Sequence, residues 1–388
     1  MRPKKAVSYR STRNVDMEEF KKDVIEKLNE LPETTDMLMK IERYNSILTE
    51  IVNKHAPMKS KTIKVVHEAP WFDSEYADIR KLRRKAEKKY KKTGLESDRK
   101  MYIALRKQAI NLSFDKKKAF ISSKLGQGTT CRTLYSVVNE LIDNKKDTVL
   151  PTSQSDKNLA DGFQQFFKEK IEKIRSTFNT PDQSDVIQEE VSGIKKLSKF
   201  EPTTVDEVLK IVKSFGVKCS PDDPVPATLL ASSIETFVPY WVEIVNLSLE
   251  IGSMDGMKSA VVLPLIKDLS SATDTEKYKN YRPVSNLVFV SKIIERVVEI
   301  RLDEHMVHND LYMDKNYGYR KDHSTELLML KVVNDLFESF DKNIPSVVVL
   351  LDLSAAFDTV DHKKLLEILK NDIGVEGVAL KWFESFLI

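Results

Sequence analysis

An acidic residue follows directly on an unbroken apolar run near the end of the sequence. The run, Val347–Leu351, contains only valines and leucines, and Asp352 comes next. Such a run predicts a strand that is buried on both faces. A carboxylate at the end of a buried strand is costly unless it is paired or binds a metal. Asp352 is therefore a candidate Mg²⁺ ligand, although the spacing alone also fits a turn or helix-capping residue.

The residues after Asp352 leave room for a ligand and then begin a helix. The three residues after Leu353 are small, so a ligand could approach the backbone, and Phe357 is the next bulky side chain. Asp358 is interpreted as a helix cap, with Asp361 three residues further on as its partner. Leucines at helical spacing follow. The sequence therefore predicts a buried strand, an acidic tip, a tight turn and a helix.

Several elements upstream are predicted from their periodicity and their end signals. Residues Val205–Phe215 have helical spacing, with Thr204 or Asp206 near the helix start. The segment Ser259–Asp268 is typical of a strand. The Ser-Thr pair at residues 324–325 is predicted to cap the helix that follows it. Helices and strands are both predicted, and we expect an α+β fold.

The sequence contains one pair of adjacent aspartates, Asp222 and Asp223. The surrounding segment, Cys219–Leu230, holds three prolines and is typical of a turn that leads into a helix. Metal binding by the pair is the alternative, but the turn explains both residues. We therefore interpret Asp222 and Asp223 as structural residues.

Composition limits the class of protein and its compartment. A length of 388 residues predicts two or three domains, and a net charge of +3 says little about partners. The two cysteines, Cys131 and Cys219, are too few for a disulfide framework and favour a reducing compartment. The basic N-terminus is not followed by an apolar segment, which argues against a secretory signal, and no membrane span is predicted. We expect an intracellular protein of the cytoplasm or nucleus.

A long helical stretch, Trp71–Leu125, is strongly basic at its centre. Between Arg80 and Lys92, Glu87 is the only acid. Such a charge run is typical of a solvated helix, but it also suits a surface that neutralises nucleic-acid phosphates. The four cations considered for RNA binding are Arg83, Arg84, Lys88 and Lys89.

Three ordered blocks resemble one known family. The Asp352 block, Val347–His362, resembles the first-aspartate motif of reverse transcriptases from LINE-type (non-LTR) retrotransposons, especially jockey-like elements. Asn280–Leu302 is similar to the arginine–proline motif of that family, and Gly318–Leu336 to its next block. The resemblance implies a helical N-terminal extension followed by the partial fingers and palm of a right-hand polymerase. It divides the chain into a connector remnant at 1–70, a basic extension at 71–179, a linker at 180–199, and fingers with partial palm at 200–388.

The same resemblance implies roles for individual residues. Asp352 is the catalytic carboxylate and binds Mg²⁺ together with the Leu353 carbonyl, while Phe357 lies under the nucleotide sugar and selects deoxynucleotides. The alternative for Phe357 is an ordinary core aromatic. Three basic residues are candidates for the nucleotide: Lys267, Arg282 and Arg320. The alternative for the arginines is that they hold their own loops. The implied partners are an RNA template, a DNA primer and deoxynucleoside triphosphates.

Part of the family pattern is absent from the sequence. The pattern continues with a hairpin that carries two adjacent aspartates and then a thumb, and neither follows Asp352. Transfer by two metal ions needs several carboxylates, so we expect this polypeptide alone not to polymerise DNA. We also expect Val347–Leu351 to form an exposed, aggregation-prone strand edge. The alternative function is a non-enzymatic RNA-binding or interaction protein left by a decayed element.

Overall fold

The computed structural model divides the chain into two compact units. One unit contains residues 1–8 and 60–150, and the other contains residues 9–59 and 151–388. The structure describes residues 4–31, 34–64, 71–124, 150–153, 155–177, 193, 195–267, 276–353 and 355–388. The predicted domain boundaries at 70, 179 and 199 do not coincide with these units. The predicted linker at 180–199 lies largely outside the described residues.

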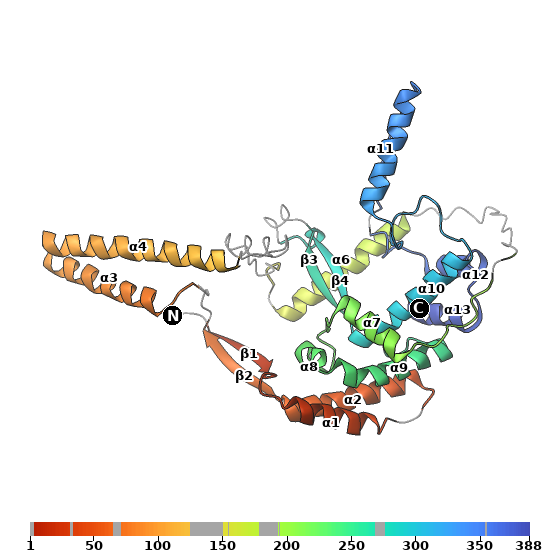
Figure 1. Ribbon diagram of the computed structural model, residues 1–388, viewed down its shortest axis with the longest axis horizontal. Helices are drawn as coiled ribbons and strands as arrows, with labels where there is room; N and C mark the ends of the chain where they lie inside the picture. Colours follow the sequence, from red (N-terminus) through yellow and green to blue (C-terminus); the bar gives the residue numbers. More distant parts are fainter. Residues whose placement is uncertain are drawn as a thin grey trace. The chain divides into compact units, whose positions relative to one another are not determined.

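The first unit is built around a hairpin of two helices, α3 (Ser74–Thr93) and α4 (Glu96–Lys124) (Figure 1). Asp73 begins α3, because its carboxylate accepts a hydrogen bond from the Tyr76 N–H at 3.0 Å. Gly94 ends α3 with a φ of +64°, a left-handed conformation that glycine adopts without steric cost. The chain then turns back, and α4 packs along α3. The predicted long helical stretch is therefore a helical hairpin.

The second unit is a group of helices that share one apolar core. Four of its core helices are α2 (Met37–His55), α7 (Val205–Phe215), α9 (Ile234–Ile251) and α10 (Phe289–His308). Helix α9 contacts the other three (Figure 1). Its Trp241 is fully buried, and the indole N–H donates to the Tyr44 hydroxyl at 2.9 Å. This bond satisfies the polar end of a large side chain that otherwise contributes apolar packing.

The second unit also contains further helices. They are α1 (Met17–Leu28), α6 (Asp156–Ser176), α8 (Ala227–Ala231), α11 (Thr325–Asp341), α12 (His362–Asn371) and α13 (Gly377–Leu387). The predicted caps are confirmed at two helix starts: Thr204 accepts from the Glu207 N–H at 3.3 Å, and Ser324 from the Leu327 N–H at 3.3 Å. None of the helices described is long and apolar enough to cross a bilayer.

In the described residues the sheets are small. Strand β3 (Ala260–Ile266) pairs antiparallel with β4 (Tyr281–Leu287), and the pairing places Leu263 opposite Val284. Strands β1 (Lys4–Arg10) and β2 (Met58–Lys64) form a second pair. The predicted strand at 259–268 is confirmed as β3. The fold is thus mixed and mainly helical, which agrees with the α+β class.

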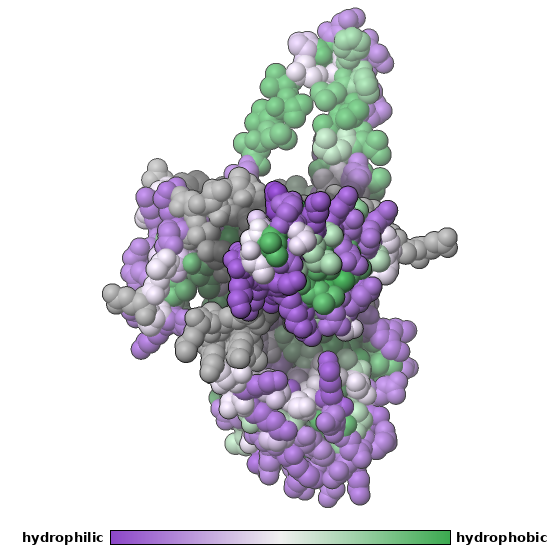
Figure 2. Space-filling view, turned by 90° about the vertical axis from the view of Figure 1, so that its left-hand side faces the viewer, coloured by the Kyte–Doolittle hydropathy of each residue, from purple (hydrophilic) through white to green (hydrophobic). Residues whose placement is uncertain are grey.

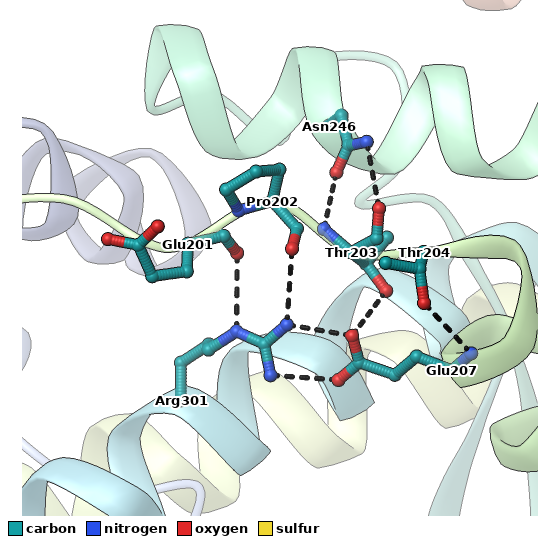
Figure 3. A network of polar contacts seen from close by, with 7 residues as sticks. All are labelled: Glu201, Pro202, Thr203, Thr204, Glu207, Asn246 and Arg301. Carbon is teal, nitrogen blue, oxygen red and sulfur yellow. Dashed lines mark hydrogen bonds and ion pairs between the residues drawn. The ribbon is translucent and has the colours of Figure 1, made fainter.

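A polar network joins three helices of the second unit (Figure 3). Arg301 of α10 forms two bonds to the Glu207 carboxylate of α7, at 2.8 and 2.7 Å. Glu207 also accepts from the Thr203 hydroxyl at 2.8 Å, and the Thr203 N–H donates to Asn246 of α9 at 2.7 Å. The Arg301 bonds hold the pKa of Glu207 below its usual range. Because the pair is bidentate and partly buried, it fixes α10 against α7.

The predicted buried strand at Val347–Leu351 is wrong. These residues have no regular secondary structure and belong to no sheet in the described structure, and Leu350 and Leu351 are 90% and 88% exposed. Apolar surface also gathers on α11, at the top of the view in Figure 2. A strand cannot satisfy its own backbone groups, so it needs a neighbouring strand, and neither small sheet lies beside this run. The run is exposed as expected, but it forms no strand and therefore no strand edge, and its tendency to aggregate stays a prediction.

Candidate functional site

The Asp352 loop lies between two ordered helices. After α11 the apolar run leads to Asp352, and a turn over residues 355–359 then leads to α12. Ala355 has a φ of +55°, and its carbonyl accepts from the Thr359 N–H at 3.1 Å, which closes the turn. Such a backbone is uncommon outside glycine and asparagine, and a small side chain limits its steric cost. The predicted tight turn after Asp352 is therefore confirmed.

Helix α12 shows which of the three aspartates acts as its cap. Asp361 accepts from the backbone N–H groups of Lys363 at 2.9 Å and Lys364 at 3.2 Å. These bonds, the Lys364 one most of all, hold the pKa of Asp361 below its usual range. Asp358 is not the cap; its carbonyl accepts from Arg175 at 3.5 Å. The capping interpretation is right for Asp361 and wrong for Asp358.

Asp352 and Leu353 are both exposed. A carboxylate oxygen followed by a backbone carbonyl is the hard-oxygen chemistry that Mg²⁺ prefers, and such sites use one or two carboxylates with substrate phosphates. In the part of the chain that the structure describes, no three His, Cys, Asp or Glu side chains lie close enough to hold a metal ion. The two residues thus fit part of a Mg²⁺ site, with the other ligands left to phosphate oxygens, water and further residues.

Phe357 contacts the block that precedes the apolar run. Its ring lies 6.0 Å from the ring of Tyr319, at an interplanar angle of 84°. Phe357 is 77% exposed, so the alternative of a core aromatic is wrong. Edge-to-face contact at this distance is a favourable aromatic geometry. The contact joins two of the three blocks that the sequence singles out.

Arg320, next to Tyr319, is bound to its own loop. Its guanidinium lies 4.9 Å from the centre of the Tyr312 ring and donates to the Met313 carbonyl at 3.3 Å. Burial raises the pKa of Tyr312 to about 12, and the nearby Asp303, which accepts its hydroxyl, adds to the shift. The structure therefore supports the alternative in which Arg320 holds its loop, and these contacts leave part of the guanidinium available.

Lys267 and Arg282 are brought together at one end of the β3–β4 hairpin. Arg282 donates to the Lys267 carbonyl at 3.0 Å, and Lys267 donates to the Lys279 carbonyl at 2.5 Å. Partial burial lowers the pKa of Lys267, and the charges of Lys170 and Arg282 lower it further. Cations gathered in this way suit an anionic ligand.

Sequence reasoning did not find Lys170 of α6. The aromatic face of this helix packs on the β4 end of the hairpin, with Phe163 lying 4.7 Å from Tyr278 and 5.0 Å from Tyr281, ring centre to ring centre. Lys170 follows Phe166 by four positions, so it continues the same side of the helix. The four-residue spacing could have placed Lys170 on the aromatic side of α6. It could not show that this side packs against Tyr278 and Tyr281.

Asp223, of the aspartate pair at 222–223, has a structural role. Asp223 accepts from the Ser220 N–H at 2.5 Å and from the Phe289 N–H, the first of α10, at 2.8 Å. Burial raises the pKa of Asp223. The structure thus confirms the turn interpretation, because the Ser220 bond closes the turn and the Phe289 bond fixes it to the start of α10.

The four cations considered for RNA binding differ in their surroundings on α3. Arg84 and Lys88 are exposed. Lys89 forms an ion pair with Asp98 at 2.8 Å, and Arg83 approaches Glu87 at 4.0 Å. The charge run is therefore only partly compensated by neighbouring acids.

Residues 272–387 match the family model described as reverse transcriptase (RNA-dependent DNA polymerase). Over this segment the chain is similar to reverse transcriptases. The Drosophila melanogaster relatives support the resemblance to jockey-like elements. The probable RNA-directed DNA polymerase from transposon BS is 29% identical over 174 residues, 44% of this chain and 19% of that protein.

Two further relatives from the same organism align over more of the chain. The probable RNA-directed DNA polymerase from transposon X-element is 23% identical over 298 residues, 77% of this chain and 28% of that protein. The RNA-directed DNA polymerase from mobile element jockey is 24% identical over 371 residues, 91% of this chain and 40% of that protein. The chain thus spans between 19% and 40% of the length of these curated relatives.

The segment matched by the family model contains most of the candidate site. Arg282, Arg320, Asp352 and Phe357 lie within residues 272–387. None of the three cavities that the structure describes is lined by Asp352, Arg282 or Arg320. Arg282 is hydrogen-bonded to Lys267, and the ring of Tyr319 contacts that of Phe357. Among the described cavities, none brings these two pairs together.

Proposed function

We propose that the chain is part of an RNA-directed DNA polymerase, in which residues 272–387 supply fingers and the first part of the palm. The observation that carries this proposal is the family match, because it contains all three sequence blocks in order. In this proposal the chain works within a larger protein, inside the cell, on an RNA template with a DNA primer. The polymerase adds deoxynucleotides to the primer end.

The proposed chemistry assigns a task to each residue of the site. The Asp352 carboxylate and the Leu353 carbonyl hold Mg²⁺, which supplies charge stabilisation to the transferring phosphoryl group when bound. Lys267, Arg282 and Arg320 bind oxygens of the triphosphate and orient it for attack by the primer 3′-hydroxyl. A bond forms from that hydroxyl oxygen to the α-phosphorus, and pyrophosphate leaves. Phe357 lies under the sugar and excludes a 2′-hydroxyl.

This proposal requires the apolar run before Asp352 to be paired. Val347–Leu351 becomes a palm strand when a neighbouring strand satisfies its backbone groups, and its exposed side chains are then buried. Pairing also holds Asp352 in one position. We predict that the 388-residue chain alone does not extend a primer. Asp352 needs further carboxylates, and Asp223 is held in its turn by bonds from Ser220 and Phe289.

A chimera tests the assignment of the site. In it, this chain replaces the aligned segment of the jockey RNA-directed DNA polymerase. We expect primer extension on RNA with deoxynucleotides, and we expect Phe357→Ala to raise the use of ribonucleotides relative to deoxynucleotides. Phe340→Ala is the matched control, because Phe340 on α11 is 78% exposed and has no assigned role. Equal sugar selection by the two variants would remove Phe357 from the site.

RNA binding without polymerisation is the second candidate function. It is favoured by the exposed Arg84 and Lys88 on α3, where the charge run is only partly compensated. Contacts of this kind make RNA affinity fall as salt rises. Reversal of Arg83, Arg84, Lys88 and Lys89 to glutamate should weaken salt-sensitive RNA binding. Unchanged binding would remove α3 from any nucleic-acid interface.

A further inference from the structure

A cavity of about 330 Å³ lies between α3 and α4 in the first unit. Four of the side chains that line it carry a positive charge: Arg80, Arg83, Arg106 and Lys117. None of its lining residues is acidic. The volume is within the range of sites that bind small ligands, and the charges select an anionic one.

The nearby acid does not cancel this charge. Glu87 approaches Arg83 at 4.0 Å, but it is bonded to Lys91 at 3.1 Å. The bond to Lys91 holds the pKa of Glu87 below its usual range, and the charges of Arg83 and Arg106 add to the shift. The single carboxylate is therefore shared by three cations, and the cavity keeps a net positive charge.

Arg83 has a donor that is not used within the hairpin. Its Nε is buried and has no hydrogen-bond partner. A buried donor without an acceptor is unfavourable, so an oxygen ligand in the cavity would satisfy it. Phosphate oxygens suit a guanidinium because two of its N–H groups can bind them in one plane.

Aromatic side chains adjoin the charges. Tyr76 lines the cavity, and the Arg80 guanidinium lies 5.9 Å from the centre of its ring. Phe114 and Ile110 also line the cavity, although they are 67% and 57% exposed. Large apolar side chains at such exposure offer a surface on which a nucleic-acid base can stack.

We propose that this cavity binds one nucleotide of a single-stranded RNA. Arg83 and Arg106 bind the phosphate, and the base stacks on Phe114. A duplex keeps its bases stacked inside, so it can offer the phosphate but not the base. The proposal rests on the proposed function, since it assigns part of the RNA template to this hairpin.

The test compares two double variants of the full chain that remove the same charge. R83Q/R106Q removes two cations from the cavity, and K85Q/K92Q removes two exposed cations of α3 that do not line it and have no assigned role. Binding of a labelled 12-nucleotide single-stranded RNA is measured by fluorescence anisotropy without metal or nucleotide. We expect the cavity variant to bind about tenfold more weakly and the control about twofold. Equal losses in the two variants would overturn the proposal.

A third variant keeps the test decisive if the cavity variant folds poorly, as judged by its helical circular dichroism. Phe114→Ala changes an exposed side chain and leaves every charge in place. We expect it to weaken single-stranded RNA about fivefold and to leave duplex RNA unchanged, because only an unpaired base reaches this ring. Equal weakening of both RNAs, or of neither, would contradict the base contact. Since no polymerisation is involved, these results are independent of the chimera assay.

Discussion

The helical core of the second unit and the Asp352 segment are close in composition but opposite in environment. In the core, Leu249 of α9 is 2% exposed, whereas Leu350 before Asp352 is 90% exposed. Polar groups differ in the same way. Arg301 bonds to the Glu207 carboxylate and donates to the Pro202 carbonyl, while Asp352 faces solvent.

The difference follows from how each kind of element satisfies its backbone. A helix forms its hydrogen bonds within itself and then needs only a neighbouring apolar face, which α7, α9 and α10 provide for one another. An extended run depends on another strand for every bond. Asp352 therefore follows a segment that needs a second strand to become ordered. Arg301 and Glu207 lie on helices that form their backbone hydrogen bonds within themselves.

The largest expected contrast comes from the same truncation at two leucines. Leu249→Ala should lower the free energy of unfolding by about 2–5 kcal/mol, because it removes packing from the buried core. Leu350→Ala should change it by less than about 0.5 kcal/mol, because the side chain is exposed. Chemical denaturation followed by circular dichroism measures both. A large loss at Leu350 would mean that the run is buried in solution.

The next contrast concerns charge. Glu207→Gln should lower the free energy of unfolding by about 2 kcal/mol at pH 7, because Arg301 loses a partly buried carboxylate. The folded pKa of Glu207 is lowered, so its contribution is present above the usual glutamate pKa and is lost as the pH falls through the lowered value.

The difference between wild type and Glu207→Gln should therefore shrink below about pH 4. Denaturation curves at pH 7, 5 and 3.5 measure this change. The matched control is Asp78→Asn, which removes an exposed ion pair with Lys81 and should cost less than about 0.5 kcal/mol. A difference that stayed constant down to pH 3.5 would show that the Glu207 charge is not what stabilises the contact.

The smallest contrast separates the two aspartates around the tight turn. Asp361→Ala should cost about 1 kcal/mol of stability, because α12 loses its N-terminal cap. Asp352→Ala should have no measurable effect, because the exposed carboxylate caps no helix. Thermal unfolding of both variants checks this. A comparable loss at Asp352 would restore the capping interpretation of that residue.

The features that could be predicted from the sequence were mainly those that depend on hydrogen bonds between residues close together in the chain. Ser324 was recognised as a cap, and Thr204 as one of two residues near a helix start, because a cap depends on residues two or three positions away. The same reasoning found Asp361 but also favoured Asp358, since either spacing permits a helix start. The prediction of a buried strand at Val347–Leu351 was wrong. The sequence pattern identifies an apolar run, but it does not show whether a second strand lies beside that run.

Features made by distant segments could not be found in this way. Lys170 joins Lys267 and Arg282 only because α6 packs on the β3–β4 hairpin, about a hundred residues away along the chain. The cavity between α3 and α4 depends on how two long helices align after Gly94. Family resemblance supplied the roles of Asp352 and Phe357, which neither spacing nor burial identifies.

The most direct test of the account is the rate of primer extension by the chimera when single aspartates are changed. With Mg²⁺, primed RNA and deoxynucleotides, Asp352→Asn should abolish extension, since the remaining amide cannot replace a charged metal ligand. Asp361→Asn should extend at nearly the parental rate, because asparagine also caps a helix. Extension by the Asp352→Asn chimera at the parental rate would contradict the assignment of Asp352 as the catalytic carboxylate.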